Sequence, residues 1–118
     1  MNVPTEHSEA VGLADYMRHR GVVFCHVPNG GRRGQLEALR LRAEGVMPGV
    51  PDYLVFSGPG GRKLKSLHGI AVELKRRKGG RVTRQQEEWL EILPVLGWHA
   101  FVAHGADDAI KQLEACWK

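Results

Sequence analysis

Two short apolar stretches decide the fold: GVPDYLVF at 49–56 and AVELK at 71–75. Both have the length and the β-branched character of strands, yet the first carries Asp52 and the second carries Glu73 and Lys75. Charged side chains are rarely buried in a sheet unless they are paired or bind a cation. The glycine-rich, basic segment between the two stretches predicts a hairpin connection.

The hairpin predicts where the charged side chains lie. Because side chains alternate along a strand, Glu73 and Lys75 share one face of theirs, and antiparallel pairing brings Asp52 beside Glu73. Two close carboxylates repel each other unless a cation lies between them, and Mg²⁺ or Mn²⁺ suits such an all-oxygen pocket. With Lys75 nearby, such a site is equipped to hydrolyse a phosphodiester. The alternative is an exposed Glu73–Lys75 ion pair, with Asp52 as a turn residue.

The rest of the chain predicts helices and strands around this hairpin. Helical periodicity and stop signals predict helices at 6–19, 35–45, 83–97 and 107–117. Short apolar runs predict strands at 22–27 and 98–103. Leu36 and Leu39 lie on one stripe of their helix, and Pro94 should kink or end its helix near Leu93. The order predicts an α/β fold: a mixed central sheet of about four strands flanked by helices, in one domain over 1–118.

The basic residues are concentrated in two parts of the chain. Segments 32–42 and 62–84 contain 13 of the 17 Lys and Arg residues, in a chain of net charge +4. Such a concentration is the footprint of a polyanion binder, and a solvated basic loop is an equal alternative. The predicted nucleic-acid contacts are Arg32, Arg33, Arg62, Lys63, Lys65, Arg76, Arg77, Lys78 and Arg81.

Several other classes of protein are not indicated. Cys25 and Cys116 form neither a disulfide framework nor a zinc pair, which favours a reduced, cytoplasmic protein. The N-terminal stretch MNVPTEHSEA lacks the pattern of a secretory signal. No apolar run approaches the ~20 residues that span a bilayer, and the six histidines are scattered without a metal-binding spacing.

The chain resembles the VRR-NUC family of the PD-(D/E)xK, or restriction-endonuclease-like, nuclease superfamily. The resemblance rests on GVPDYLVF, on AVELKRRKGGRVTRQQEEWLEIL and on the closing GW-strand-helix unit, and it covers nearly the whole chain. It implies a Mg²⁺-dependent nuclease, with Mn²⁺ able to substitute. The family's metal-binding aspartate matches Asp52, its second acid matches Glu73, and its catalytic lysine matches Lys75.

The resemblance implies further site residues. The backbone carbonyl of Leu74 is expected to bind metal, and the family's glutamine matches Gln86, with Gln85 as the alternative. The family's first-helix glutamate matches Glu9, with Glu6 as the alternative, and Glu9 would complete the acidic metal pocket. Each has a structural interpretation as well: TRQQ is a capping box, and Glu9 can simply favour the helix dipole.

The resemblance also implies a biological activity. We expect a DNA endonuclease, selective for Holliday junctions or other branched DNA, that acts as a homodimer in the cytoplasm of a bacterial or phage-infected cell. Phosphate is expected to enter between the basic hairpin loop and the loop after Lys75. The alternatives are a non-catalytic nucleic-acid-binding module of the same fold and a ribonuclease.

Overall fold

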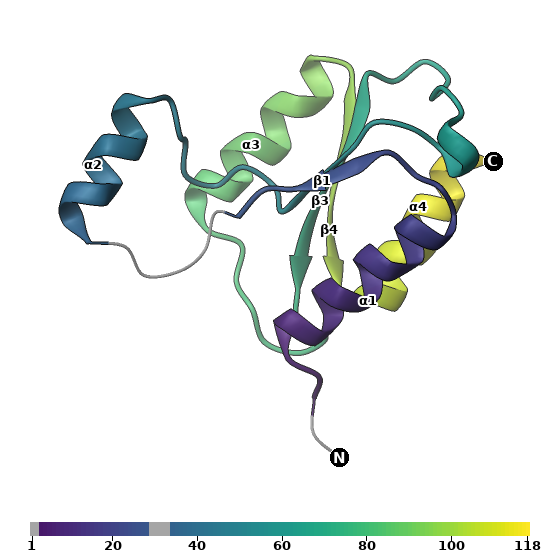
Figure 1. Ribbon diagram of the computed structural model, residues 1–118, viewed down its shortest axis with the longest axis horizontal. Helices are drawn as coiled ribbons and strands as arrows, with labels where there is room; N and C mark the ends of the chain where they lie inside the picture. The colour runs from purple at the N-terminus through teal and green to yellow at the C-terminus, as the bar shows by residue number, and fades with distance from the viewer. Residues whose placement is uncertain (1–2, 29–33) are drawn as a thin grey trace.

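A four-stranded mixed sheet lies at the centre of the computed structural model, which describes residues 3–28 and 34–118 (Figure 1). The elements in chain order are α1 (Glu6–His19), β1 (Phe24–His26), α2 (Gln35–Ala43), β2 (Tyr53–Val55), the 3-10 turn η1 (Pro59–Gly61), β3 (Gly69–Lys75), α3 (Arg84–Val95), β4 (Trp98–His104) and α4 (Ala106–Trp117). The strand order is β1-β2-β3-β4, with antiparallel pairing from β1 to β3 and parallel pairing of β3 with β4. The predicted α/β fold is confirmed.

One face of the sheet packs against α1 and α4 (Figure 1). Leu13 and Met17 of α1 and Leu113 of α4 are fully buried there, in one cluster with Val72 and Leu74 of β3. Each such side chain stabilises the fold by roughly 1.5–3 kcal/mol when it is removed from water. This core therefore fixes the direction of β3 and sends its alternate side chains to the other face.

Helix α3 covers the face of the sheet that carries Glu73. Thr83 begins the helix with a reciprocal capping box, in which its hydroxyl and backbone N–H both bond to Gln86. The helix was expected to kink or end near Leu93, but it continues to Val95. Pro94 lies in the last turn, where its missing N–H removes only one helical hydrogen bond. The backbone N–H groups of Leu96 and Gly97 still donate to carbonyl oxygens of this turn.

Helix α2 stands apart from the sheet (Figure 1). None of its residues is buried, and Leu36 and Leu39 are 78% and 63% exposed. The predicted apolar stripe therefore has no partner in the described parts of the chain. The segment that follows returns to the body at α3, where the indole N–H of Trp89 donates to the carbonyl oxygen of Pro48 at 3.0 Å.

Both cysteines and the helices α1 to α4 lie in the described parts of the chain. Cys25 is exposed on β1, Cys116 is half-buried on α4, and both are free thiols. Among residues 3–28 and 34–118, no helix has the length and apolar character needed to cross a membrane.

Candidate active site

Strand pairing brings two acidic side chains together at the open end of the β2–β3 hairpin. Tyr53 pairs with Val72, so the next rung outward joins Asp52 to Glu73. The Oδ2 atom of Asp52 accepts a hydrogen bond from the backbone N–H of Leu74 at 2.8 Å. The carbonyl oxygen of Asp52 accepts another, from Val27, at 2.6 Å. Asp52 is thus fixed on both sides by neighbouring strands, with its carboxylate beside Glu73.

Glu73 is buried in a setting that disfavours its charge. The residue is 2% exposed, and its Oε2 atom accepts a hydrogen bond from Gln86 at 3.3 Å and lies 3.5 Å from the Lys75 ammonium. Its Oε1 atom is buried and has no hydrogen-bond partner among the described residues. Burial, and then the negative charge of Asp52, raise the pKa of Glu73 to about 8. A buried carboxylate with an unbonded oxygen, next to a second carboxylate, is a donor set that suits a hard divalent cation.

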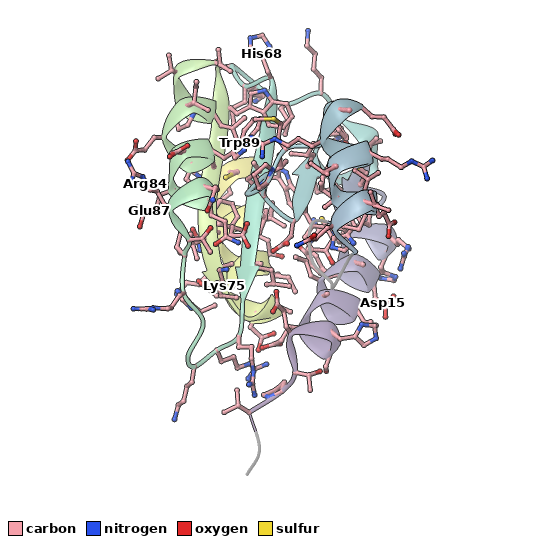
Figure 2. The ribbon with its side chains drawn as sticks, turned by 90° about the vertical axis from the view of Figure 1, so that its left-hand side faces the viewer. Asp15, His68, Lys75, Arg84, Glu87 and Trp89 are labelled. Atoms are coloured by element: carbon pink, nitrogen blue, oxygen red, sulfur yellow. The ribbon has the colours of Figure 1, made fainter. Side chains whose placement is uncertain are left out.

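Lys75 completes the group on the same face of β3. Its side chain is 11% exposed, and its Nζ donates to Oε1 of Gln86 at 3.0 Å. Figure 2 shows Lys75 between the end of β3 and α3, whereas Arg84 and Glu87 lie on the outer side of that helix. The structure therefore gathers Asp52, Glu73 and Lys75 from two strands into one sheltered place.

Gln86 has two roles in the geometry, one in the helix cap and one in the site. Its Oε1 accepts from the backbone N–H of Thr83 at 2.8 Å as well as from Lys75 at 3.0 Å, while its Nε2 donates to Glu73. The capping interpretation and the site interpretation therefore hold together. Gln85, the alternative from the sequence, is exposed.

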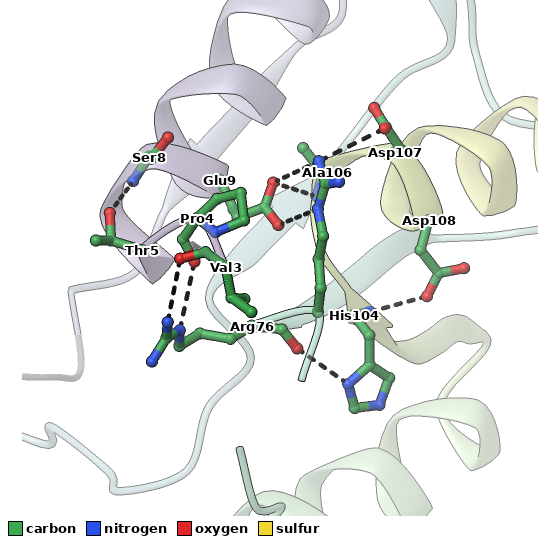
Figure 3. Close-up of polar contacts among 11 residues, drawn as sticks. Val3, Pro4, Thr5, Ser8, Glu9, Arg76, His104, Ala106, Asp107 and Asp108 are labelled. Atoms are coloured by element: carbon green, nitrogen blue, oxygen red, sulfur yellow. Dashed lines mark hydrogen bonds and ion pairs between the residues drawn. The ribbon is translucent and has the colours of Figure 1, made fainter. Parts of the chain in front are cut away.

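The structure does not place Glu9 with Asp52 and Glu73. Glu9 is 4% exposed, and its carboxylate accepts hydrogen bonds from Arg77 at 2.8 and 3.4 Å and from the backbone N–H of Ala106 at 3.3 Å (Figure 3). The Arg77 hydrogen bond holds the pKa of Glu9 below its ordinary value. Within the described parts of the chain, no group of three or more His, Cys, Asp or Glu residues is positioned to hold a metal.

The expected acidic pocket therefore consists of a pair of carboxylates. Glu9 joins the start of α1 to the loop after β3 and to the N-terminus of α4, because the parallel β3–β4 pair brings both segments to the same end of the sheet. Its alternative, Glu6, is exposed at the first residue of α1.

The loop after β3 divides its cations between internal contacts and solvent. The Arg76 guanidinium donates to the carbonyl oxygens of Val3 and Pro4 at 3.3 Å (Figure 3), and Arg77 binds Glu9. These two predicted phosphate contacts are thus bonded to other parts of the chain, although both residues are exposed. Lys78 and Arg81 are exposed, and their side chains form no ion pair among the described residues.

The hairpin loop lies at the other end of β3, which corrects the predicted path of the phosphate. The hairpin closes beyond the Val55–Ile70 pair, whereas Asp52 and Glu73 lie at its open end. The loop cations Arg62, Lys63 and Lys65 therefore do not flank the carboxylate pair, and phosphate cannot enter between this loop and the one after Lys75. Arg32 and Arg33 lie outside the described residues.

Gly49 is a positioning residue that the sequence interpretation missed. Its φ of +85° lies in the region that favours glycine, and a Cβ there would be 2.5 Å from the backbone carbon of Gln85. The close approach seats the connector before Asp52 against the start of α3, which carries Gln86. The glycine in GVPD was the available signal, although one sequence cannot show which helix it approaches.

The site is of the PD-(D/E)xK class, on a mixed α/β fold. It has an aspartate at the start of one strand, a Glu-x-Lys on the hairpin partner of that strand, and a helix that brings a glutamine to both. The VRR-NUC domain model matches residues 5–107, and the chain belongs to this nuclease-type family.

A solved structure gives the same picture of the fold. The chain is 22% identical to a structure described as a VRR_NUC domain protein, with a TM-score of 0.80 and coverage of 98% of this chain and 90% of that one. This likeness shows a shared fold along almost the full length of both chains. Among curated proteins, no match was found.

Proposed function

We propose that this VRR-NUC domain is a metal-dependent DNA endonuclease that hydrolyses phosphodiester bonds in branched DNA. The observation that carries the proposal is the Asp52–Glu73 pair, in which Glu73 is buried with an unbonded oxygen and Lys75 lies on the same face. An amphipathic surface strand, the alternative from the sequence, would leave these side chains in water. The burial of Glu73 and the low exposure of Lys75 instead call for a function that uses these two groups.

Asp52, Glu73 and the backbone carbonyl of Leu74 are the groups that would hold Mg²⁺, or Mn²⁺ in its place. The fit rests on the unbonded Oε1 atom of Glu73 and on oxygen-only donors. When bound, the ion would supply Lewis-acid polarisation of the phosphoryl group.

Lys75 and Gln86 would position the reacting groups. The Lys75 ammonium is held by Gln86 at 3.0 Å and by Glu73 at 3.5 Å, in a place from which most water is excluded. There it can donate a hydrogen bond to the attacking water or to a phosphoryl oxygen, where negative charge develops. The Thr83 cap fixes the Gln86 amide, so the support of Lys75 is built before substrate arrives.

Phosphates on either side of the cut would meet Lys78 and Arg81. Both are exposed in the loop that leaves β3 next to Lys75. Phosphate contacts displace counterions, so binding should weaken as salt rises.

The branched substrate leads us to propose a homodimer. A two-fold junction needs two symmetric cuts, which a two-fold dimer supplies. Helix α2 offers an exposed apolar surface, at Leu36 and Leu39, for a second copy of the chain. The free thiols of Cys25 and Cys116 fit the reducing cytoplasm of a bacterial or phage-infected cell.

A cleavage panel tests the proposal. Single-stranded, duplex, flap and four-way DNA, with RNA of the same shapes, are incubated with Mg²⁺ or with EDTA. We expect Mg²⁺-dependent cuts in branched DNA that leave a 5′-phosphate and a 3′-hydroxyl, and their loss in Lys75→Ala. Lys111→Ala, an exposed lysine on α4, is the matched control and should cleave as the wild type does.

Three outcomes would contradict parts of the proposal. Binding without cleavage by both wild type and Lys75→Ala would make this a binding module. Preferential cleavage of RNA would make it a ribonuclease. A monomer in sedimentation, at concentrations where four-way DNA is cut, would remove the dimer.

A further inference from the structure

A second basic surface lies at the end of the sheet away from Asp52 and Glu73. It is a cavity of about 730 Å³, here called the hairpin-end cavity, between the end of α1, the hairpin loop and the end of α4. Its cationic and aromatic lining comprises Arg20, Arg62, Lys63, Lys65, Trp117 and Lys118, and one acid, Glu114, also lines it.

The positive charge of this cavity is only partly neutralised. Arg20 lies 3.3 Å from Glu114, which accounts for the single acid. The side chains of Arg62, Lys63 and Lys65 form no ion pair or hydrogen bond with any described residue. Unpaired cations around one hollow repel each other, and an anion in the hollow would relieve that repulsion.

The hairpin loop that carries these cations is tied to the body of the protein. Lys63 forms an antiparallel bridge with Ser57, and the backbone N–H of Gly60 donates to the carbonyl oxygen of Arg20 at 2.8 Å. Leu64, between the two lysines, is buried in the main core. The cations therefore start from an anchored backbone, which lowers the entropic cost of using them in binding.

Trp117 forms an aromatic wall of the same cavity. Its ring stacks on Tyr16 with 6.4 Å between centroids, and its indole N–H is buried without a hydrogen-bond partner in the described part of the chain. Gly58 of the hairpin loop lies over this ring. The protein's own groups thus leave the positive charge at the cavity unpaired, beside an aromatic wall that is fixed by packing.

We propose that the hairpin-end cavity binds the phosphate backbone of the nucleic acid at a distance from the bond that is cut. The inference rests on the proposed nuclease function and adds a second contact to it. Four residue steps of β3 separate Gly69 from Glu73, which is about 13 Å at ~3.3 Å per residue. Because duplex DNA rises ~3.4 Å per base pair, the cavity would grip an arm at least about four base pairs from the cut.

The test separates this grip from the chemistry. The affinity of Lys63→Ala/Lys65→Ala for a 20-base-pair duplex, a probe length we choose, is measured in EDTA over a range of NaCl concentrations. Each phosphate contact contributes about −0.9 to the slope of log K against log salt, so we expect the slope of the variant to be less negative by roughly 1.8. The matched control, Arg18→Ala/Lys111→Ala, removes two exposed cations from α1 and α4, outside both basic segments, and should keep the wild-type slope.

Cleavage then distinguishes the two proposals. With Mg²⁺ and saturating branched DNA, the kcat of Lys63→Ala/Lys65→Ala should equal that of the wild type, while KM rises. An unchanged salt slope, or an equal loss in the control variant, would overturn the second contact even if the wild type cuts DNA. If the wild type does not cut DNA, the nuclease proposal is wrong. The salt dependence of duplex binding then still tests, by itself, whether this surface binds nucleic acid.

Discussion

The buried Glu73 carboxyl predicts an unusual pH dependence for the metal-free protein. Its pKa is raised from 4.5 to about 8 in the native state, chiefly by burial and secondly by Asp52. Between these two values the native state binds more protons than the unfolded state does. The free energy of unfolding should therefore fall as pH rises from about 4.5 to about 8, and this contribution should level off above that range.

The magnitude follows from the size of the pKa shift. Each unit corresponds to about 1.36 kcal/mol, so the raised pKa of Glu73 costs the native state up to about 5 kcal/mol above pH 8 and about 3 kcal/mol at pH 7, where the native carboxyl is still mostly protonated. Below pH 5 the cost falls under about 1 kcal/mol. The variant Glu73→Gln keeps the volume of the side chain and cannot ionise, so it should stabilise the metal-free protein by these amounts.

Urea denaturation in EDTA, at half-unit steps from pH 5 to 8.5, measures the effect. The informative quantity is the difference in the free energy of unfolding between Glu73→Gln and the wild type, because other titrating groups cancel in it. Glu91→Gln removes an exposed carboxylate of α3 and serves as the matched control, with a difference near zero throughout. A Glu73→Gln variant that is less stable than the wild type at pH 8, or a difference that does not grow with pH, would refute the argument.

Three other perturbations test the site and its supports. Mg²⁺ at one hundred times its Kd should raise the free energy of unfolding by about 2.7 kcal/mol. The variant Glu9→Gln should show the same increase. If the increase is lost in this variant, Glu9 is a metal ligand after all. Arg77→Ala should lower the free energy of unfolding by roughly 1–3 kcal/mol, because it leaves the buried Glu9 carboxylate without its ion-pair partner. Denaturation measured from pH 7 to 3 should show this loss shrinking as acid protonates Glu9. Gly49→Ala should lower both the melting temperature and the cleavage rate, because the new Cβ would meet Gln85. Gly45→Ala is the control: Gly45 has a φ of +103° and a Cβ there would have no neighbour within 4 Å, so only a backbone strain of about 1–2 kcal/mol is expected.

The parts of the fold that local pattern controls could be predicted from the sequence. Alternation in AVELK and the turn residues before it are enough to expect a hairpin, and antiparallel pairing then places Asp52 beside Glu73. The capping box of Thr83 and Gln86 is also a local signal. Each of these inferences uses residues close in sequence, or residues joined by one turn.

The errors concern contacts between distant segments. Glu9 and Arg77 are far apart in sequence, and nothing local shows that α1 packs against α4 with its start beside the loop after β3. The stripe of Leu36 and Leu39 has helical spacing, but spacing cannot say whether a partner surface exists. The predicted phosphate path overlooked a topological fact, because the closed end of a hairpin is necessarily remote from an Asp52–Glu73 pair at its open end.

The segment between β1 and β2 begins and ends on a single rung of the sheet. Val27 and Asp52 are joined by a hydrogen bond of 2.6 Å, although the whole of α2 lies between them in sequence. Since doubling a flexible loop adds only about 0.6 kcal/mol to its closure cost, the part of this excursion around α2 can change in length with little effect on Asp52, as long as Pro48 and Gly49 keep their contacts with α3. The exposed surface of α2 can thus change while Asp52 keeps its place beside Glu73.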